Sequence, residues 1–289
     1  MNDAVRLLWL LTNPFKRNAR TVYDLLSDNN NLGERSLYLN LGYWDGARKY
    51  DDACEALAKV LAEAARLAPG DEVLDCGFGF GDQDLYWVRA YEIRRIVGLN
   101  ITASQVRAAR KRVIELGLDD RVDLCEGSAT AMPLADASFN KVVALETAFH
   151  YDTREDFFRE AFRVLKPGGR LATADILPLG SGGSAGLRER LERYLNRSFW
   201  QIPNGNMYPA SVYIEKLRGA GFVNVESRSI REKVYPSFAL YAKRRLEEPE
   251  IMSRMKPMVR AFWKISVKDE HSFDSVDYVI VSADKPVNA

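Results

Sequence analysis

A short glycine-rich segment carries the residues best suited to hold a small molecule. Gly77, Gly79 and Gly81 occur at alternate positions between the apolar run 73–76 and the polar run 82–84. Glycine has no Cβ atom, so the backbone of such a turn can approach a ligand closely. The turn opens a predicted helix, whose free N–H groups favour an anion. We therefore expect a small-molecule site at the carboxyl edge of a parallel sheet.

The glycine spacing indicates which kind of ligand this turn suits. A dinucleotide-binding turn has the pattern G-x-G-x-x-G, and Asp82 occupies the place of its third glycine. Asp75, two residues before the first glycine, can accept a hydrogen bond from a ligand ammonium group. Both features favour S-adenosylmethionine over a pyrophosphate, although an ordinary strand-to-helix turn would carry the same glycines.

Histidine is the side chain best suited to accept a proton near pH 7. The chain has two, and His271 directly follows the charged run 268–270, which indicates a solvated loop. His150 follows a predicted strand at the edge where ligands bind, so it is our candidate general base. The alternative interpretation is that His150 is a structural histidine held by hydrogen bonds. For Glu146, which ends the same strand, we favour a structural role on the cofactor side over catalysis.

The composition is that of an ordinary globular protein. The chain has 289 residues, of which 47% are hydrophobic and 28% charged, and a net charge of +1, which gives no strong field for nucleic acid or an acidic membrane. Cys54, Cys76 and Cys125 are too few for a disulfide framework, and no Cys/His group has zinc spacing, so we predict no metal. The apolar stretch 5–11 is too short to span a bilayer. We expect a cytoplasmic protein without stable membrane insertion and leave homo-oligomer formation open.

Predicted strands and helices alternate through the middle of the chain. Apolar residues at helical spacing indicate a helix over residues 53–68. Short apolar runs predict strands at residues 72–76, 95–100, 122–126, 141–146 and 170–176. Helical patterns occur at residues 82–90, 104–116 and 156–165, the last followed by the turn 166–169. This alternation indicates βαβ units and a parallel sheet covered on both faces.

The regular alternation ends after the fifth strand. Residues 180–184 form a predicted flexible joint, followed by helices at 187–195 and 211–220 and a strand at 223–230. Residues 236–264 are predicted to be largely helical with interruptions near Pro249 and Pro257, and 277–283 forms the last strand. We divide the chain into a helical cap (1–50), a cofactor-binding core (51–178) and lid insertions with the final strands (179–289).

Four segments together resemble the class I S-adenosylmethionine-dependent methyltransferases. They are residues 73–81, 126–130, 145–151 and 165–169. The segments 40–44, 77–84 and 146–151 are also similar to sugar O-methyltransferases of the erythromycin and rebeccamycin type. The resemblance implies a Rossmann-like α/β fold. Its seven-stranded sheet would be mostly parallel, with an antiparallel last strand, flanking helices and a helical lid.

The resemblance also implies roles for individual residues. Tyr23 and Tyr43 would close over the methionine end of the cofactor, Asp75 would lie near its ammonium, and Asn100 stands where the family has an acid for the ribose hydroxyls. The full cofactor-binding set is Tyr23, Tyr43, Asp75, Gly77, Phe78, Gly79, Gly81, Gln83, Asn100, Ile101, Gln105, Ser128, Ala129 and Glu146. The implied catalytic residue is His150, and the predicted substrate-binding residues are Tyr151, Trp200, Asn206 and Tyr208.

These observations predict an enzyme that moves a methyl group from S-adenosylmethionine to a small, fairly apolar metabolite. A hydroxyl is the favoured acceptor, on a glycosylated polyketide, a terpenoid or a lipid-like alcohol. An S- or C-methyltransferase remains an alternative because the cofactor motifs do not define the acceptor. The rivals from other classes are a nicotinamide dehydrogenase and a non-catalytic S-adenosylmethionine-binding protein.

Overall fold

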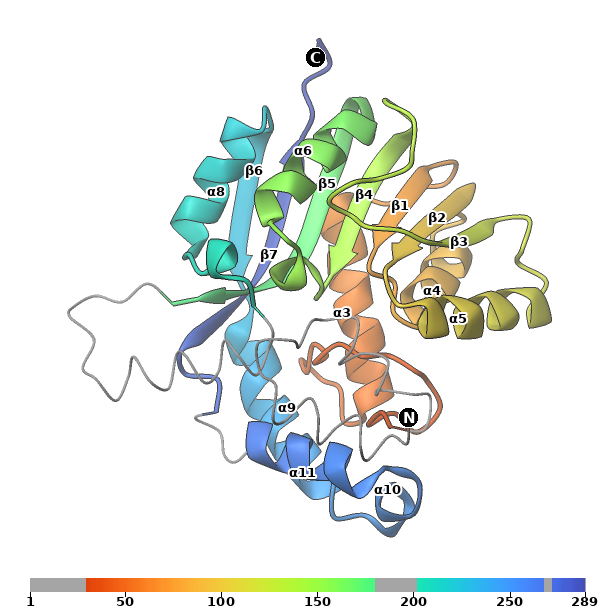
Figure 1. The fold of residues 1–289 in the computed structure, drawn as a ribbon, viewed down its shortest axis with the longest axis vertical. Helices are drawn as coiled ribbons and strands as arrows, with labels where there is room; N and C mark the ends of the chain where they lie inside the picture. The colour runs from red at the N-terminus through yellow and green to blue at the C-terminus, as the bar shows by residue number, and fades with distance from the viewer. Residues whose placement is uncertain (1–29, 180–201, 268–271, 289) are drawn as a thin grey trace.

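A seven-stranded sheet runs through the molecule in a computed structural model that describes residues 30–179, 202–267 and 272–288 (Figure 1). The strand order is β3-β2-β1-β4-β5-β7-β6. All neighbours are parallel except β7, which is antiparallel to both β5 and β6. The strands are β1 (Glu72–Cys76), β2 (Arg95–Asn100), β3 (Val122–Glu126), β4 (Phe139–Leu145), β5 (Leu165–Pro178), β6 (Val223–Ser229) and β7 (Val276–Asp284). The predicted fold class is confirmed.

The fifth strand differs from its prediction. It begins at Leu165, which pairs with Phe139, and regular pairing resumes only where Arg170 lies opposite Lys141. The Lys-Pro-Gly-Gly run at 166–169, predicted to be a turn, is therefore an irregularity inside β5. Gly168 has a φ of +77°, and its N–H donates to the Lys285 carbonyl at 3.1 Å. Pairing with β4 before the run and with β7 beyond it holds a local turn sequence within the sheet.

The helices largely follow the predicted pattern. They are α3 (Tyr50–Ala65), α4 (Asp82–Ala90), α5 (Ala103–Glu115), α6 (Arg154–Val164), α8 (Ala210–Gly219), α9 (Arg231–Arg245), α10 (Pro249–Arg254) and α11 (Pro257–Ser266). The predicted start of α9 at Pro236 was wrong, since the helix begins five residues earlier. Proline is usual in a first helical turn, which made Pro236 a plausible start. Burial of Val234 and Tyr235 in the core favours the earlier turn.

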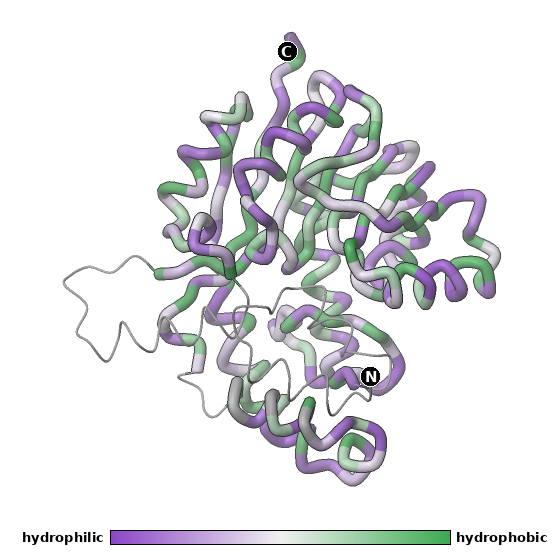
Figure 2. Tube along the Cα trace, viewed as in Figure 1, coloured by the Kyte–Doolittle hydropathy of each residue, from purple (hydrophilic) through white to green (hydrophobic). Residues whose placement is uncertain are grey.

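Alternate strand residues face opposite helical layers. Val73 and Val143 belong to a core cluster with α3, α4 and α5, whereas Leu74 and Val142 belong to a second cluster with α6 and α8. Figure 1 shows α6 and α8 in front of the sheet and α3 behind it. Hydrophobic residues concentrate along the strands, and hydrophilic ones on the outward helical surfaces (Figure 2). The sheet is thus buried on both faces, as its parallel strands require.

Helices α9–α11 lie at the end of the molecule where the 30–49 segment lies (Figure 1). The ring of Tyr241 on α9 is 5.0 Å from that of Trp44 and stacks on Tyr50 at 6.1 Å. The described part of the predicted helical cap, residues 30–49, contains no helix. The predicted joint 180–184 and helix 187–195 lie outside the described residues.

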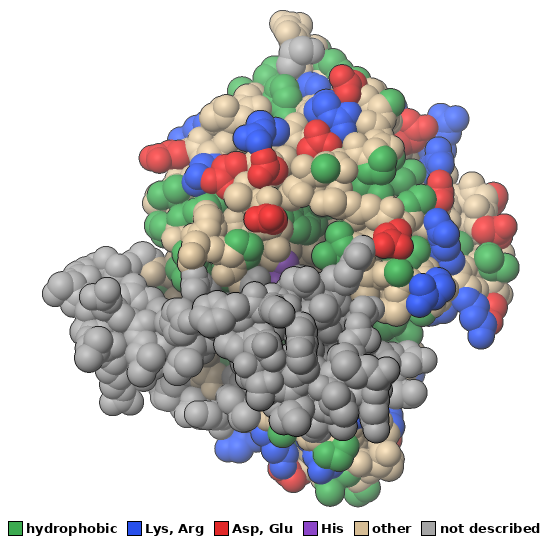
Figure 3. All heavy atoms as spheres, in the orientation of Figure 1, with side chains coloured by type: hydrophobic (Ala, Val, Ile, Leu, Met, Phe, Trp, Pro, Cys, Tyr) green, Lys and Arg blue, Asp and Glu red, His purple; other side chains and the backbone are tan. Residues whose placement is uncertain are grey.

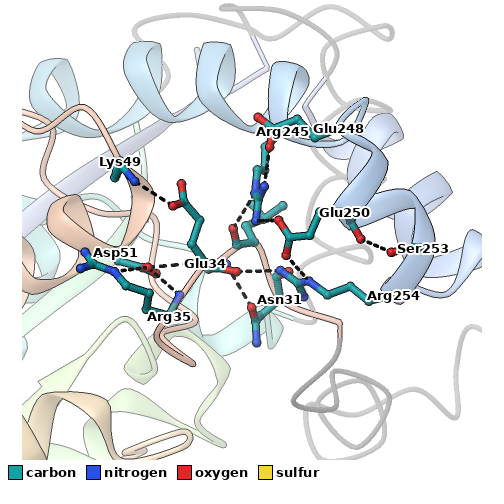
Figure 4. Close-up of polar contacts among 12 residues, drawn as sticks. Asn31, Glu34, Arg35, Lys49, Asp51, Arg245, Glu248, Glu250, Ser253 and Arg254 are labelled. Atoms are coloured by element: carbon teal, nitrogen blue, oxygen red, sulfur yellow. Dashed lines mark hydrogen bonds and ion pairs between the residues drawn. The ribbon is translucent and has the colours of Figure 1, made fainter.

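Two arginines fasten these helices to the 30–49 segment (Figure 4). The Arg254 guanidinium donates to the backbone oxygens of Asn31 at 3.0 Å and Gly33 at 2.6 Å. Arg245 donates through Nε to the Leu32 oxygen at 3.2 Å. The C-terminal helices therefore hold the backbone of the segment directly.

Acidic and basic side chains intermix on the described surface in Figure 3. No helix of the described ranges combines the length and the apolar character needed to cross a membrane. Across the same ranges, no group of three or more His, Cys, Asp or Glu side chains is placed to hold a metal ion.

Candidate functional site

A cavity of about 420 Å³ opens at the carboxyl ends of β1, β2 and β4. The loops that follow these strands and β3 form most of its lining. The predicted site residues that line it are Gly77, Phe78, Gly79, Gln83, Asn100, Ile101, Gln105, Ser128, Ala129, Glu146, His150 and Tyr151. Most of the predicted cofactor set and the candidate base thus share one cavity.

The glycine turn has the tight geometry that its composition predicts. Gly77 has a φ of +88°, and a Cβ atom there would lie 2.2 Å from Oγ1 of Thr147. Only glycine fits at this position. Gly79, with a φ of +58°, is less enclosed, because a Cβ atom there would meet only Leu39 at 3.5 Å. The backbone at Gly79 is therefore open on its cavity side.

Asp75 lies behind the cavity wall and not in it. Its side chain is fully buried, and Nε2 of Gln83 donates to its Oδ2 at 3.0 Å. Gln83 lines the cavity, so it stands between Asp75 and any ligand. Because the Gln83 amide nitrogen is used by Asp75, its carbonyl oxygen remains available to a ligand donor. The predicted direct contact of Asp75 thus becomes an indirect one.

A second buried carboxyl group lies against Asp75. Asp84 on α4 is fully buried, and its carboxyl group adjoins that of Asp75. Burial raises the pKa of Asp75 to about 7, and burial together with the Asp75 charge raises the pKa of Asp84. Two carboxyl groups in such surroundings do not both ionise, so the pair holds a proton near neutral pH.

Asn100 is more constrained than its predicted ribose contact assumes. Its Oδ1 accepts from the Thr102 N–H at 3.0 Å, and its Nδ2 donates to Gln105 at 2.9 Å and to the Gly79 carbonyl at 3.3 Å. Asn100 therefore ties the glycine turn to the end of β2. The Gln105 amide nitrogen is buried without a partner in the described protein and lies at the cavity. It is a donor placed to meet a ligand oxygen.

The remaining cavity edge offers apolar surface. Ile101 is 37% exposed and lines the cavity, so its side chain presents apolar surface to a ligand. Ala129 is buried and belongs to the same lining. The Ser128 hydroxyl shares a hydrogen bond of 2.9 Å with Thr130.

His150 ends the short helix η2 (Ala148–His150), which directly follows β4. Its ring lies 4.0 Å from that of Phe149. Asn206 holds the backbone on either side of it, because Nδ2 donates to the Phe149 carbonyl at 3.1 Å and to the Tyr151 carbonyl at 2.7 Å. The candidate base thus stands on a fixed backbone at the cavity.

The predicted substrate contacts of Asn206 and Tyr208 differ from their positions in the structure. Neither residue lines the cavity. Asn206 is fully buried, and its Oδ1 accepts from the Arg154 N–H at 3.0 Å. Arg154 in turn forms a fully buried ion pair with Asp175 at 2.8 Å. Tyr208 packs its ring 5.3 Å from the Arg154 guanidinium.

Glu146 lies between β4 and η2 with a left-handed φ of +53°. Its Oε2 accepts from the Leu41 N–H at 2.9 Å and from the Tyr278 hydroxyl at 2.7 Å. Burial raises the pKa of Glu146 to about 8. Because the carboxyl group keeps its proton at neutral pH, little of it is ionised and able to accept a proton.

One wall of the cavity was not predicted. Residues 37–40 of the 30–49 segment line it, together with Asp82, which forms an ion pair with Arg112 at 2.6 Å. No local sequence pattern marks this wall, apart from the resemblance of residues 40–44. Tyr43 is half-buried against the core and lies outside the lining. Tyr23 and Trp200 lie outside the described residues.

The cavity residues fit S-adenosylmethionine. The unpartnered Gln105 donor suits a ribose hydroxyl, exposed Ile101 suits the adenine face, and the open backbone at Gly79 admits close approach. Gln83 offers a carbonyl oxygen, backed by a carboxyl group, to an ammonium. The turn is therefore suited to a ligand with a positive group at one end and a nucleoside at the other.

Known proteins with similar sequences are methyltransferases. A family described as a methyltransferase domain matches residues 74–173. Erythromycin 3''-O-methyltransferase of Saccharopolyspora erythraea is 40% identical, over 96% of this chain and 93% of that protein. The 27-O-demethylrifamycin SV methyltransferase of Amycolatopsis mediterranei is 31% identical, over 86% and 90%.

A solved structure shares the fold over nearly the whole chain. The cyclase SpnF superposes with a TM-score of 0.74 at 27% identity, covering 93% of this chain and 95% of that one. Together with the sheet order and the cavity, these similarities confirm the family resemblance of the sequence motifs. The chain therefore belongs to the class I S-adenosylmethionine-dependent methyltransferases.

Proposed function

We propose that this enzyme methylates a hydroxyl group on the sugar of a glycosylated natural product of the macrolide type. The observation that carries the proposal is the 40% identity to erythromycin 3''-O-methyltransferase across 93% of that protein. His150 at the cavity adds the proton acceptor that a hydroxyl needs. The shared length includes the C-terminal helices, so the similarity is not confined to the cofactor-binding core.

S-adenosylmethionine supplies an electrophilic methyl group, and the residues of this chain bind and orient the reactants. We assign the carbonyl oxygen of Gln83 to the cofactor ammonium, with Asp75 fixing the amide orientation. Gln105 donates to the ribose, and Ile101 with Ala129 contacts the adenine. We also retain Gly77, Phe78, Gly79, Gly81, Asn100 and Ser128 as the remaining described parts of this site.

His150 is the group that would accept the proton of the acceptor hydroxyl. The oxygen–methyl bond would form as the methyl–sulfur bond breaks, with S-adenosylhomocysteine as the leaving group. Asn206 keeps the His150 backbone in place by binding the carbonyls on both sides of it. Asn206 and Tyr208 are thus assigned to support of the base instead of direct substrate contact. Tyr151 lines the cavity, but its hydroxyl donates to the Cys76 carbonyl at 2.9 Å, so we assign its ring and not its hydroxyl to the acceptor.

The cellular setting is part of the same proposal. Cys54, Cys76 and Cys125 are free thiols, which supports a reducing compartment such as the cytoplasm. The intermixed surface charge supports a small-molecule acceptor over nucleic acid. We keep the division into a cap (1–50), a core (51–178) and a lid with the final strands (179–289).

The test uses methyl-labelled S-adenosylmethionine and a macrolide glycoside with a free sugar hydroxyl. The matched control acceptor is the same macrolide without its sugar, and a small thiol tests S-methylation. We expect label in the glycoside alone, with mass spectrometry locating it on the sugar oxygen. Label in the sugar-free macrolide or the thiol would contradict the acceptor class. Cofactor binding without transfer to any acceptor would contradict the enzymatic reaction.

A further inference from the structure

The 37–40 wall of the cofactor cavity is fastened at its two ends. At one end, the Leu37 N–H donates to Oδ1 of Asp82 at 3.2 Å. At the other end, the Leu41 N–H donates to Oε2 of Glu146 at 2.9 Å. Both acids themselves line the cavity. These two carboxyl groups act beside a further anchor, because the Tyr50 hydroxyl donates to the Asn40 carbonyl at 2.7 Å.

Glu146 joins three parts of the fold that are far apart in sequence. It follows β4, receives Leu41 from 105 positions earlier and receives the Tyr278 hydroxyl, at 2.7 Å, from β7, 132 positions later. Tyr278 is fully buried. Both donors bind the same oxygen, Oε2, so the bridge from the wall to the sheet passes through one atom.

The carboxyl groups of Asp82 and Glu146 differ in the charge of their partners. Asp82 faces the guanidinium of Arg112, with contacts of 2.6 and 2.9 Å. The partners of Glu146 among the described residues are neutral, namely one amide and one hydroxyl. Burial without a cation raises its pKa to about 8. A neutral carboxyl group that carries its proton on Oε1 keeps two lone pairs on Oε2, so Oε2 can accept both bonds without charge.

We propose that Glu146 is a positioning residue that holds the 37–40 wall against the cofactor through its acceptor oxygen and not through its charge. The inference rests on the S-adenosylmethionine site assigned above and deepens it. Loss of Oε2 removes the bond to the Leu41 N–H, while Asp82 still holds Leu37 and Tyr50 still holds the Asn40 carbonyl. The expected effect is therefore weaker cofactor binding.

The experiment compares four single variants. Glu146→Gly removes the side chain at a left-handed φ that glycine adopts without strain. Its matched control is Glu92→Gly, because exposed Glu92 has a similar φ of +50° and lies outside the cavity lining. Glu146→Gln keeps an acceptor oxygen without a titratable group. Tyr278→Phe removes the other donor and leaves the Leu41 bond.

Two measurements are made on each variant. Hydrogen exchange of the Leu41 amide is followed in the protein alone, and calorimetry gives the Kd for S-adenosylhomocysteine. In Glu146→Gly we expect Leu41 to exchange at least ~10-fold faster and Kd to rise ~10-fold or more, as for a lost hydrogen bond. Glu146→Gln, Tyr278→Phe and Glu92→Gly should stay within about 3-fold of the wild type in both measurements.

The outcomes separate the inference from the assigned site. Wild-type Leu41 protection or wild-type Kd in Glu146→Gly overturns the positioning role. Glu146→Gln behaving like Glu146→Gly also overturns it, because charge would then be the property that matters. If the wild type binds no S-adenosylhomocysteine, the assigned cofactor site is wrong. The Leu41 exchange data still test whether Glu146 holds the wall. If Glu146→Gly does not fold, exchange of the Leu41 amide in Glu146→Gln shows whether an uncharged acceptor oxygen is sufficient. Exchange in Tyr278→Phe then shows whether the Leu41 bond persists without the second donor.

Discussion

A variant of His150 tests methyl transfer separately from cofactor binding. His150 ends η2 and lines the cavity that we assign to S-adenosylmethionine. We expect His150→Ala to lower kcat about 100-fold or more, the contribution typical of a general base. The Kd for S-adenosylhomocysteine should remain within about 2-fold of the wild type by calorimetry. Turnover at the wild-type rate would remove the base role.

Asn206 acts on the same residue through the backbone. Asn206→Ala deletes the two bonds to the carbonyls flanking His150, so the imidazole loses its fixed position. We expect kcat to fall about 10-fold with little change in the acceptor KM, since misplacement of a catalytic group slows the chemical step. Steady-state kinetics measures both constants.

The control for Asn206 is Tyr208→Phe. The buried Tyr208 hydroxyl has no hydrogen-bond partner in the described residues, and Tyr208 does not line the cavity. Its removal should leave both kcat and KM within about 2-fold. A raised acceptor KM in Tyr208→Phe would restore the sequence-based prediction of a substrate contact.

Glu146 also predicts a pH dependence of stability. Burial raises its folded-state pKa to about 8, above the unfolded value of about 4.3, so the folded state holds the extra proton between these values. The stabilisation that the Glu146 carboxyl group contributes is complete below its unfolded-state pKa. It is lost as the pH rises through the folded-state pKa of about 8. Between pH 7 and 9, the wild type should lose about 1 kcal/mol more than Glu146→Gln. Urea unfolding at several pH values measures the difference, and parallel curves would contradict it.

At the scale of elements, the fastening of the 30–49 segment to α10 is open to test. Arg254 donates to two backbone oxygens of the segment and pairs with half-exposed Glu250. Because exposed ion pairs contribute little, we attribute its effect to the backbone bonds. Arg254→Ala should lower the free energy of unfolding by about 1–3 kcal/mol, and Glu250→Gln by under about 1 kcal/mol. Equal losses in the two variants would assign the effect to the ion pair.

The elements themselves were largely predictable from local sequence. Apolar runs bounded by turn residues gave β1, β2 and β3 with their observed bounds, and the glycine turn gave the start of α4. The errors occur where tertiary contacts override a local signal. Sheet pairing absorbs the Pro-Gly-Gly turn into β5, and core packing places Pro236 inside α9.

At the scale of the whole molecule, the cavity floor, which the loops after β1, β2, β3 and β4 form, was predictable from the sequence. The 37–40 wall was not. The floor is made of residues within a few positions of strand ends, where sequence and space coincide. The 37–40 wall depends on Glu146, more than a hundred positions away, and no local pattern encodes such a partner. The burial of Asn206 outside the cavity lining could not be predicted, because a polar residue in an aromatic loop has the same sequence signal whether it faces a substrate or a backbone.

The place of β7 in the sheet has a consequence for biosynthesis. It lies between β5 and β6 although both are made before it, so β6 has no neighbour in the sheet until residues 276–284 leave the ribosome. Until then, the edges of β5 and β6 are unpaired and open to other chains. The same strand brings Tyr278 to Glu146. During translation, the growing chain can therefore pair β1 to β5, whose loops line the cavity, before β7 is available to complete the other half of the sheet.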